Sequence, residues 1–271
     1  MNIFDLILVQ PLTNGLLFFY KILAGNMGFA IIAFSTFLRF VTTPLTTPYM
    51  NSMKKMKDVA PLVEKLKKKY KGDQKKLMAA QAELYKQKGI NPTSGCLPYI
   101  IQIIILIGLF NVFNRVLSVD ANAFENTKQM LYPWLNIDLG SGLNNSFLYL
   151  NLSRPDTFKI EGLPFPIPGP LLILAGLLQF VSAKMNLPLV QKEKKVAKTT
   201  PSEVDDIAVS MQSSMVYTFP LMTIVFGINF ASGLALYWLI FSIFQIYQQY
   251  QNGGWGGLLP FVNKLKSFKS Q

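Results

Sequence analysis

Five long apolar segments constrain the fold of this chain more than any other feature of its sequence. As a helix rising about 1.5 Å per residue, residues 27–48 are long enough to cross a hydrocarbon core of about 30 Å. Only 15% of the chain is charged, whereas soluble domains have about 25% charged residues. The sequence therefore predicts an all-α integral membrane protein with five transmembrane helices, at residues 27–48, 97–113, 170–185, 216–230 and 234–250.

The segments around the spans predict how the rest of the chain is organised. Residues 1–25 are apolar but interrupted by polar positions, so we expect an amphipathic helix lying at the outer interface rather than a span. The five-span core is expected over residues 26–250. It would include a cytoplasmic helical hairpin at 51–93, an extracytoplasmic loop at 114–168 and a cytoplasmic loop at 186–213, with a basic cytoplasmic tail at 251–271.

Lysines are concentrated directly after the first span. Residues 51–91 contain twelve lysines and four acidic residues, a net charge of +8. Basic segments also follow the third and fifth spans, and such an excess is typical of cytoplasmic loops. We therefore expect the N-terminus outside and the C-terminus in the cytoplasm.

The lysine-rich segment has the pattern of two short helices. Apolar positions recur at helical spacing on both sides of Gly72, where a turn is expected, and Asp73 is placed to cap the second helix. Nucleic acid is not expected as a dedicated target, because the segment has no arginine and few aromatic residues. Five lysines are expected to recruit partners and to suit anionic lipid head groups: Lys67, Lys68, Lys69, Lys75 and Lys76.

The sequence offers no catalytic or metal-binding constellation. It has no histidine, a single cysteine at Cys96 and no phosphate-binding loop. We therefore expect no disulfide framework, metal centre, cofactor or enzymatic activity. The N-terminal residues also lack the basic region of a secretory signal and a cysteine for a lipid anchor.

Arg39 is the most informative residue of the sequence. It lies about 18 Å along a helix from Met27, and its predicted span contains no acidic residue. An arginine at mid-membrane costs about 2.5–3.5 kcal/mol on insertion scales. The alternative is snorkelling to the inner interface near Pro48, but that distance of about 13 Å exceeds comfortable side-chain reach. We therefore expect a hydrated cavity that opens to the cytoplasm.

Polar side chains of the other spans are placed to line the same cavity. Taken singly, each is more often an interhelical hydrogen-bond partner than a ligand contact. Tyr237 and Trp238 fit its wall or an ordinary packing role equally well. Around one arginine, the set favours a polar groove that attracts acidic segments. The predicted groove residues are Arg39, Gln102, Gln179, Ser182, Trp238, Ser242 and Gln245.

Short motifs follow one another in a specific order from about Leu12 onward. The first span has Asn26-Met-Gly-Phe-Ala-Ile-Ile, Leu38-Arg39 and Pro44-Leu45, and the lysine-rich segment has Lys71-Gly-Asp and Gly89-Ile-Asn-Pro. The later spans have Gly95-Cys-Leu-Pro, Ile107-Gly-Leu-Phe, Pro220 and Ser232-Gly-Leu through Leu236-Tyr-Trp238. Each motif is weak alone, but their order and spacing together resemble the YidC/Oxa/Alb family of membrane protein insertases.

The resemblance implies a core whose hydrophilic groove is open to the cytoplasm and to lipid but closed to the outside. Arg39, Gln179 and Trp238 would belong to the groove, and Arg39 would receive the acidic or polar tail of a small substrate protein. Expected partners are nascent membrane proteins, the ribosome transiently, a Sec translocon and anionic lipids, in a bacterial cytoplasmic membrane. Two alternatives remain: a small transporter, which usually has internal repeats that this sequence lacks, and an assembly chaperone without insertase activity.

Overall fold

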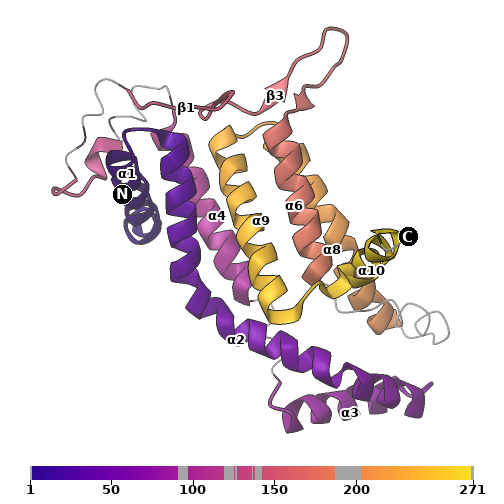
Figure 1. The fold of residues 1–271 in the computed structure, drawn as a ribbon. Helices are drawn as coiled ribbons and strands as arrows, with labels where there is room; N and C mark the ends of the chain where they lie inside the picture. Colours follow the sequence, from indigo (N-terminus) through magenta and orange to yellow (C-terminus); the bar gives the residue numbers. More distant parts are fainter. Residues whose placement is uncertain are drawn as a thin grey trace. The chain divides into compact units, whose positions relative to one another are not determined.

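The computed structural model describes residues 2–90, 97–118, 125, 127–135, 137, 142–186 and 203–269. These residues are mostly helical, as the sequence predicts (Figure 1). They form two compact units, which are described separately below. The first unit comprises Met1–Val41, Ile101–Gln179 and Phe219–Phe244, and the second comprises Thr42–Ile100, Phe180–Thr218 and Gln245–Gln271.

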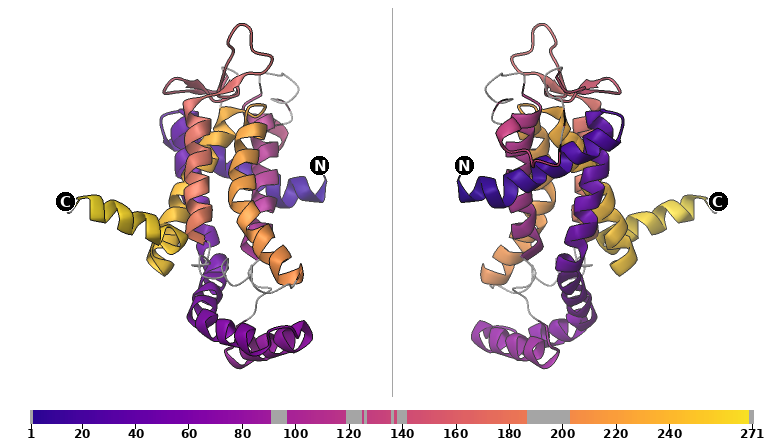
Figure 2. Two further views of the ribbon diagram at one scale, coloured as in Figure 1. Left: turned by 90° about the vertical axis from the view of Figure 1, so that its right-hand side faces the viewer. Right: turned by 90° about the vertical axis from the view of Figure 1, so that its left-hand side faces the viewer.

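The N-terminal segment of the first unit is helical from the start. A π-helical turn, η1 (Asp5–Val9), leads directly into α1 (Gln10–Ile22). Figure 2 shows that α1 runs across the longer helices of its unit rather than alongside them. The Asn14 amide donates to the carbonyl of Met130 at 2.8 Å and its oxygen accepts from the Tyr132 N–H at 2.7 Å. The predicted helix is present, and its place at a membrane interface stays a prediction.

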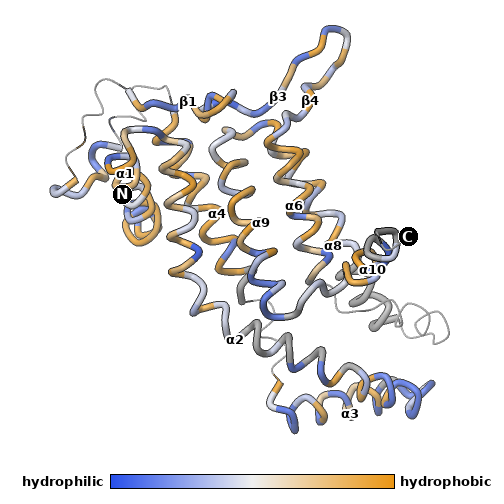
Figure 3. Tube along the Cα trace, viewed as in Figure 1, coloured by the Kyte–Doolittle hydropathy of each residue, from blue (hydrophilic) through white to orange (hydrophobic). Residues whose placement is uncertain are grey.

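Helix α2 (Met27–Lys69) is much longer than the predicted first span. It continues through Pro44, Pro48 and Pro61, although the prolines at 44 and 48 are expected to mark the end of the span. Each proline removes one N–H donor, but the residues between them keep theirs, so the ladder of hydrogen bonds continues on both sides. Figure 3 shows that the helix changes from mostly hydrophobic to hydrophilic along its length.

Helices α4 (Leu97–Val116), α6 (Pro170–Asn186), α8 (Glu203–Gly227) and α9 (Ser232–Gly253) follow. Their parts in the first unit form a bundle with the first turns of α2, in which α4 and α9 lie nearest to α2 and α6 lies beside α8 (Figures 1 and 2). Buried apolar side chains from α1, α2, α4, α6 and α9 form one core there, including Leu16, Ile31, Leu109, Leu172 and Leu236.

The part of the predicted cytoplasmic loop that the structure describes is largely helical. Helix α8 begins at Glu203, well before the predicted start of its span at residue 216. Acidic residues at 203, 205 and 206 favour a helix start here, because negative charge stabilises the N-terminal end of a helix. The loop lysines at 192, 194, 195 and 198 lie outside the described residues.

Membrane-crossing length is clear for one helical stretch among the residues that the structure describes. Met27–Pro48 is both long and apolar enough to cross a bilayer. Ile100–Val116, Pro170–Met185 and Val216–Gly227 are apolar but shorter. The count of five spans therefore stays a prediction.

Two short strand pairs lie at one end of the first unit (Figure 1). Strand β1 (Ser146–Phe147) pairs with β2 (Leu150–Asn151), and β3 (Thr157–Phe158) pairs with β4 (Ile167–Pro168), both antiparallel. The prediction of an all-α fold omits them, because two-residue strands are too short to show an alternating pattern. Their loop accepts backbone hydrogen bonds from the first turn of α9: Ser232 N donates to the Arg154 carbonyl at 2.8 Å and Gly233 N to the Leu152 carbonyl at 3.1 Å.

Asp156, in the same loop, caps the N-terminus of α6. Its carboxylate is only 3% exposed and accepts from the Leu172 N–H at 2.9 Å and from the Tyr149 hydroxyl at 3.2 Å. The Tyr149 hydroxyl in turn accepts from the Leu171 N–H at 2.9 Å. Burial raises the pKa of this tyrosine above its ordinary value. One buried acid thus connects the loop to the first turn of α6.

The second unit contains the end of α2 and α3 (Gln74–Gln87), which lie beside each other in Figures 1 and 2. Between them Gly72 has a φ of +95°, which favours glycine. Val59, Val63 and Leu77 are buried. The turn and both helices are where the sequence places them, whereas a hairpin on the cytoplasmic side stays a prediction.

Replacing Asp73 by alanine is expected to loosen the first turn of α3. The Asp73 carboxylate accepts from the Lys76 N–H at 3.1 Å and pairs with the Lys76 ammonium at 2.9 Å. These hydrogen bonds lower the pKa of Asp73, so the cap is present above the ordinary carboxyl pKa and is lost as pH falls through the lowered value. Amide hydrogen exchange of residues 74–77 should be several-fold faster in Asp73→Ala. Asp73→Asn, which also caps helices, should exchange like the unchanged protein; equal rates in all three proteins would contradict the cap.

Candidate functional site

Arg39 on α2 reaches α9 within the first unit. The central carbon of its guanidinium lies 4.5 Å from the ring centroid of Phe241, within the range of a cation–π contact. Phe241 in turn packs against Tyr237, one helical turn earlier on α9, with ring centroids 6.1 Å apart. The Arg39 side chain is half-buried. A packed pair of aromatic rings on one face of α9 therefore adjoins the cation, and Phe241 contacts it directly.

Gln102 brings α4 into the same group. Its amide donates to the Tyr237 hydroxyl at 3.0 Å, and Tyr237 is only 4% exposed. We call Arg39, Gln102, Tyr237 and Phe241 the arginine cluster. It joins α2, α4 and α9, and it unites two of the predicted groove residues, Arg39 and Gln102, through Tyr237.

Sequence reasoning gave Tyr237 only an optional role and missed Phe241. The signal that could have found both is their spacing, since residues four apart lie on the same face of a helix. Trp238, the neighbouring position, packs against the buried core instead, and Ser242 is 2% exposed. Trp238 thus makes packing contacts, as expected for the ordinary packing role that the sequence leaves open beside a role in the groove wall.

Gln179 and Thr223 form a second polar contact in the first unit. The Thr223 hydroxyl on α8 donates to the Gln179 side-chain oxygen on α6 at 2.5 Å. Ser182 and Gln245 belong to the second unit, where Ser182 is 1% exposed and Gln245 is half-buried. For Gln179, the structure therefore shows the interhelical hydrogen bond that the sequence leaves open as an alternative.

The hydrogen bond between Gln179 and Thr223 is expected to stabilise the packing of α6 on α8 only modestly. Interhelical hydrogen bonds in membrane proteins contribute about 0.6 kcal/mol on average. A double-mutant cycle with Gln179→Leu and Thr223→Val, measured by unfolding in detergent, should give a coupling free energy of about this size. Strictly additive effects of the two substitutions would show that the contact contributes nothing to stability.

The helices of the first unit present large apolar side chains on their outer surface. Soluble monomers rarely expose continuous apolar patches above about 300–600 Å². Arg39 lies between two such residues on α2, since Phe37 is 49% and Phe40 is 67% exposed. Others are Phe29, Ile103, Ile104, Ile107, Leu174, Leu177, Leu221 and Phe226. These exposed side chains fit a lipid environment rather than water.

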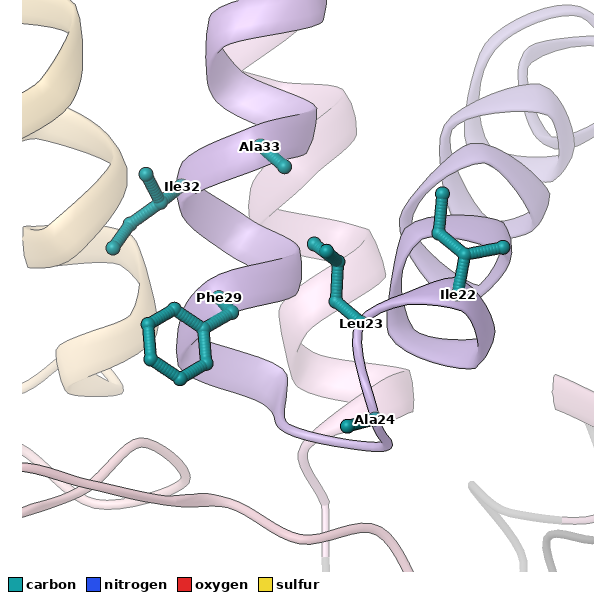
Figure 4. Close-up of a pocket in the computed structure, with 6 residues that line it drawn as sticks. All are labelled: Ile22, Leu23, Ala24, Phe29, Ile32 and Ala33. Carbon is teal, nitrogen blue, oxygen red and sulfur yellow. The ribbon is translucent and has the colours of Figure 1, made fainter.

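An apolar pocket of about 540 Å³ lies where α1 ends and α2 begins (Figure 4). The side chains that line it are all apolar, and none belongs to the predicted groove. Such a lining suits a hydrocarbon chain and offers nothing to an acidic segment. The pocket is lined by Ile22, Leu23, Ala24, Phe29, Ile32 and Ala33.

The five lysines of the predicted recruitment surface lie on α2 and α3 in the second unit. Lys68, Lys69, Lys75 and Lys76 are exposed and Lys67 is half-buried. The Lys69 ammonium lies 5.3 Å from the Tyr70 ring centroid, and the Lys76 ammonium pairs with the Asp73 carboxylate. Most of this positive charge therefore faces solvent.

Comparison with known proteins decides the family. The family described as "60Kd inner membrane protein" matches residues 18–253. A relative from Fusobacterium nucleatum subsp. nucleatum, named membrane protein insertase YidC, is 31% identical over 222 residues, which cover 81% of this chain and 82% of that protein. The chain belongs to the YidC/Oxa/Alb family. The family resemblance of the sequence motifs is thereby confirmed, and an inner membrane location follows.

Other YidC-family relatives are longer than this chain. The relative from Pelobacter propionicus is 33% identical over 239 residues, 88% of this chain but 36% of that protein. The relative from Prosthecochloris aestuarii is 30% identical over 219 residues, 81% of this chain and 32% of that protein. Both are named membrane protein insertase YidC, and the chain spans about a third of their length.

A solved structure shares the fold. The crystal structure of an active YidC insertase with its first transmembrane domain resolved superposes with a TM-score of 0.52 at 23% identity, over 92% of this chain and 47% of the other. The mainly helical fold thus has an experimental counterpart within the family.

Proposed function

We propose that this protein is a membrane protein insertase. It receives hydrophilic, often acidic, segments of nascent membrane proteins at a polar groove containing Arg39, and it releases their apolar segments sideways into lipid. The observation that carries the proposal is the arginine cluster, a cation held on helices whose outer surfaces are apolar. Family membership supports it, because the relatives are named insertases.

The arginine cluster suits transient binding of a carboxylate. Two unit charges 4 Å apart interact by about 4 kcal/mol at an effective dielectric of about 20. That attraction offsets part of the cost of moving an acid out of water, yet it is weak enough for release. A guanidinium can pair with a carboxylate through two parallel N–H groups, which suits an arginine to the acidic tail of a substrate.

Release into lipid follows from the neighbours of Arg39. Phe40 follows Arg39 directly, is 67% exposed, and packs edge-on against Phe244, which is three residues from Phe241 on the same face of α9. An apolar segment tethered by its tail at Arg39 would therefore meet apolar side chains and lipid directly. Its transfer into hydrocarbon is favourable at roughly 25 cal/mol per Å² of apolar surface, which drives the step without nucleotide hydrolysis.

The proposed topology has five spans, with the N-terminus outside and the C-terminus in the cytoplasm. The lysine excess of residues 51–91 supports a cytoplasmic location for the end of α2 and for α3. We propose that their exposed lysines recruit nascent chains or ribosomes and contact anionic lipids. On this proposal the protein works alone or with a Sec translocon.

The test is reconstitution of the purified protein in liposomes of defined lipids. The substrate has one apolar segment and a short N-terminal tail, and protease protection measures how much of the tail crosses the bilayer. Acidic and neutral tails should be protected well above the level of protein-free liposomes, whereas a lysine tail of equal length should not. Protection equal to that of protein-free liposomes for every tail would refute the proposal. Improved folding of a substrate without tail translocation would indicate an assembly chaperone instead.

A further inference from the structure

Helix α10 (Leu259–Lys269) combines exposed apolar side chains with a purely basic charge. Phe261 is 63% exposed and Leu259 is 39% exposed. Residues 251–271 contain three lysines, at 264, 266 and 269, and no acidic residue. Exposed apolar side chains are unfavourable in water, and a neutral protein surface would not attract the lysines.

The spacing along α10 separates apolar from polar positions. Positions 261, 265 and 268 are Phe, Leu and Phe, and residues three and four apart share one face of a helix. Positions 263 and 267 are Asn and Ser and fall on the other side, whereas Lys264 borders the apolar face. An apolar face of aromatic and aliphatic residues beside lysines is the pattern of a helix that lies in the plane of a membrane surface.

The turn between α9 and α10 fixes where the second helix starts. A Cβ atom at Gly256 would lie 2.0 Å from the Met185 carbonyl oxygen, and the φ of Gly256 is +47°. The Gln249 amide donates to the same carbonyl at 3.3 Å. Figures 1 and 2 show that α10 leaves the last turns of α9 at a steep angle. The turn is thus held against the end of α6 within the second unit.

Aromatic side chains mark the same turn. Trp255 is 37% exposed, and its ring packs edge-on against Tyr250 with ring centroids 5.1 Å apart. Tryptophan and tyrosine gather at membrane–water interfaces, where the ring is apolar and its N–H or O–H reaches water. The two rings are consistent with a turn at the level of the lipid head groups.

We propose that α10 binds the anionic surface of the bilayer on the side where α9 ends, with its apolar face among the upper acyl chains. The proposal rests on the topology of the proposed function, in which α9 spans the membrane. Charge complementarity selects the partner: each lysine near an anionic membrane surface strengthens binding by about five-fold. Such a helix fixes the C-terminal end of α9 at the membrane surface.

The test uses the full-length protein with Cys96→Ser and one new cysteine that carries an environment-sensitive fluorophore. Phe261→Cys reports the apolar face of α10, Asn263→Cys the polar face, and Ile243→Cys, which is 45% exposed on α9, reports whether that helix lies in lipid. Each protein is placed in nanodiscs that contain lipids brominated on the upper acyl chain, with either a third phosphatidylglycerol or phosphatidylcholine alone.

Quenching at position 261 should exceed that at 263 several-fold, and it should fall in phosphatidylcholine alone or when the three lysines are replaced by glutamate. Equal quenching at positions 261 and 263, or quenching that does not depend on lipid charge, would overturn the proposal. If position 243 is still quenched in that case, the proposed topology stands. Loss of quenching at 243 would overturn the topology itself. A fluorescence change at 261 that requires added ribosomes would assign α10 to ribosome binding instead.

Discussion

Arg39→Ala is expected to reduce insertion of an acidic-tailed substrate at least ten-fold in proteoliposomes. The substitution removes an attraction of about 4 kcal/mol at an effective dielectric of about 20, and a loss of about 1.4 kcal/mol already gives a factor of ten. Arg39→Lys keeps the charge and should retain most of the activity. The measurement is the initial rate of tail protection at matched protein density.

Comparing substrates with an acidic and a neutral tail tests whether the effect of Arg39→Ala depends on charge. For a neutral tail, the loss in Arg39→Ala should be much smaller, because no ion pair is removed. Arg154→Ala deletes an exposed arginine of the loop and should insert both substrates normally. If Arg39→Ala folds and inserts the acidic tail as fast as the unchanged protein, the cation has no part in insertion.

Asp156→Ala is expected to cause the largest loss of stability among single substitutions in the loop. It leaves the Leu172 N–H and the Tyr149 hydroxyl without their carboxylate partner, and removes the cap of α6. The cap and the buried donor left unsatisfied are the same Leu172 N–H, so we expect a single cost of about 1–3 kcal/mol. Thermal unfolding in detergent measures the change.

Two variants separate the cap from a general effect of charge. Asp156→Asn keeps a side-chain oxygen that can accept from Leu172, so it should lose less stability than Asp156→Ala. Glu161→Ala removes an exposed acid of the same loop and should leave the unfolding temperature unchanged. An Asp156→Ala protein as stable as the Glu161→Ala protein would show that the cap carries little of the stability of α6.

The sequence predicts the class of protein and most helices because apolar length and lysine distribution are properties of single segments. Helix α6 was expected over residues 170–185 and is found at Pro170–Asn186. The sequence predicts the first span and the first hairpin helix as separate helices, whereas they form one helix, α2, because a long helix tolerates the missing N–H donors of its prolines. The start of α8 at Glu203 was missed because a polar segment reads as a loop.

The sequence predicts which polar residues belong to the candidate site, but it does not predict which of them contact one another. Arg39 was found from the cost of its charge, which needs no knowledge of its neighbours. Its contact with Phe241 and the bond between Gln102 and Tyr237 depend on which faces of α2, α4 and α9 meet. That information lies in tertiary packing. Periodicity within each helix leaves it undetermined.

The loop that carries the strand pairs holds the adjoining ends of two helices. Asp156 bonds to the first turn of α6, and the backbone of residues 152 and 154 bonds to the first turn of α9. The other ends of the same two helices are tied as well, because the Gln249 amide of α9 donates to the Met185 carbonyl at the end of α6. Helices α6 and α9 are thus fastened to each other at both ends. A chain that enters between them would first have to break one of these two sets of hydrogen bonds.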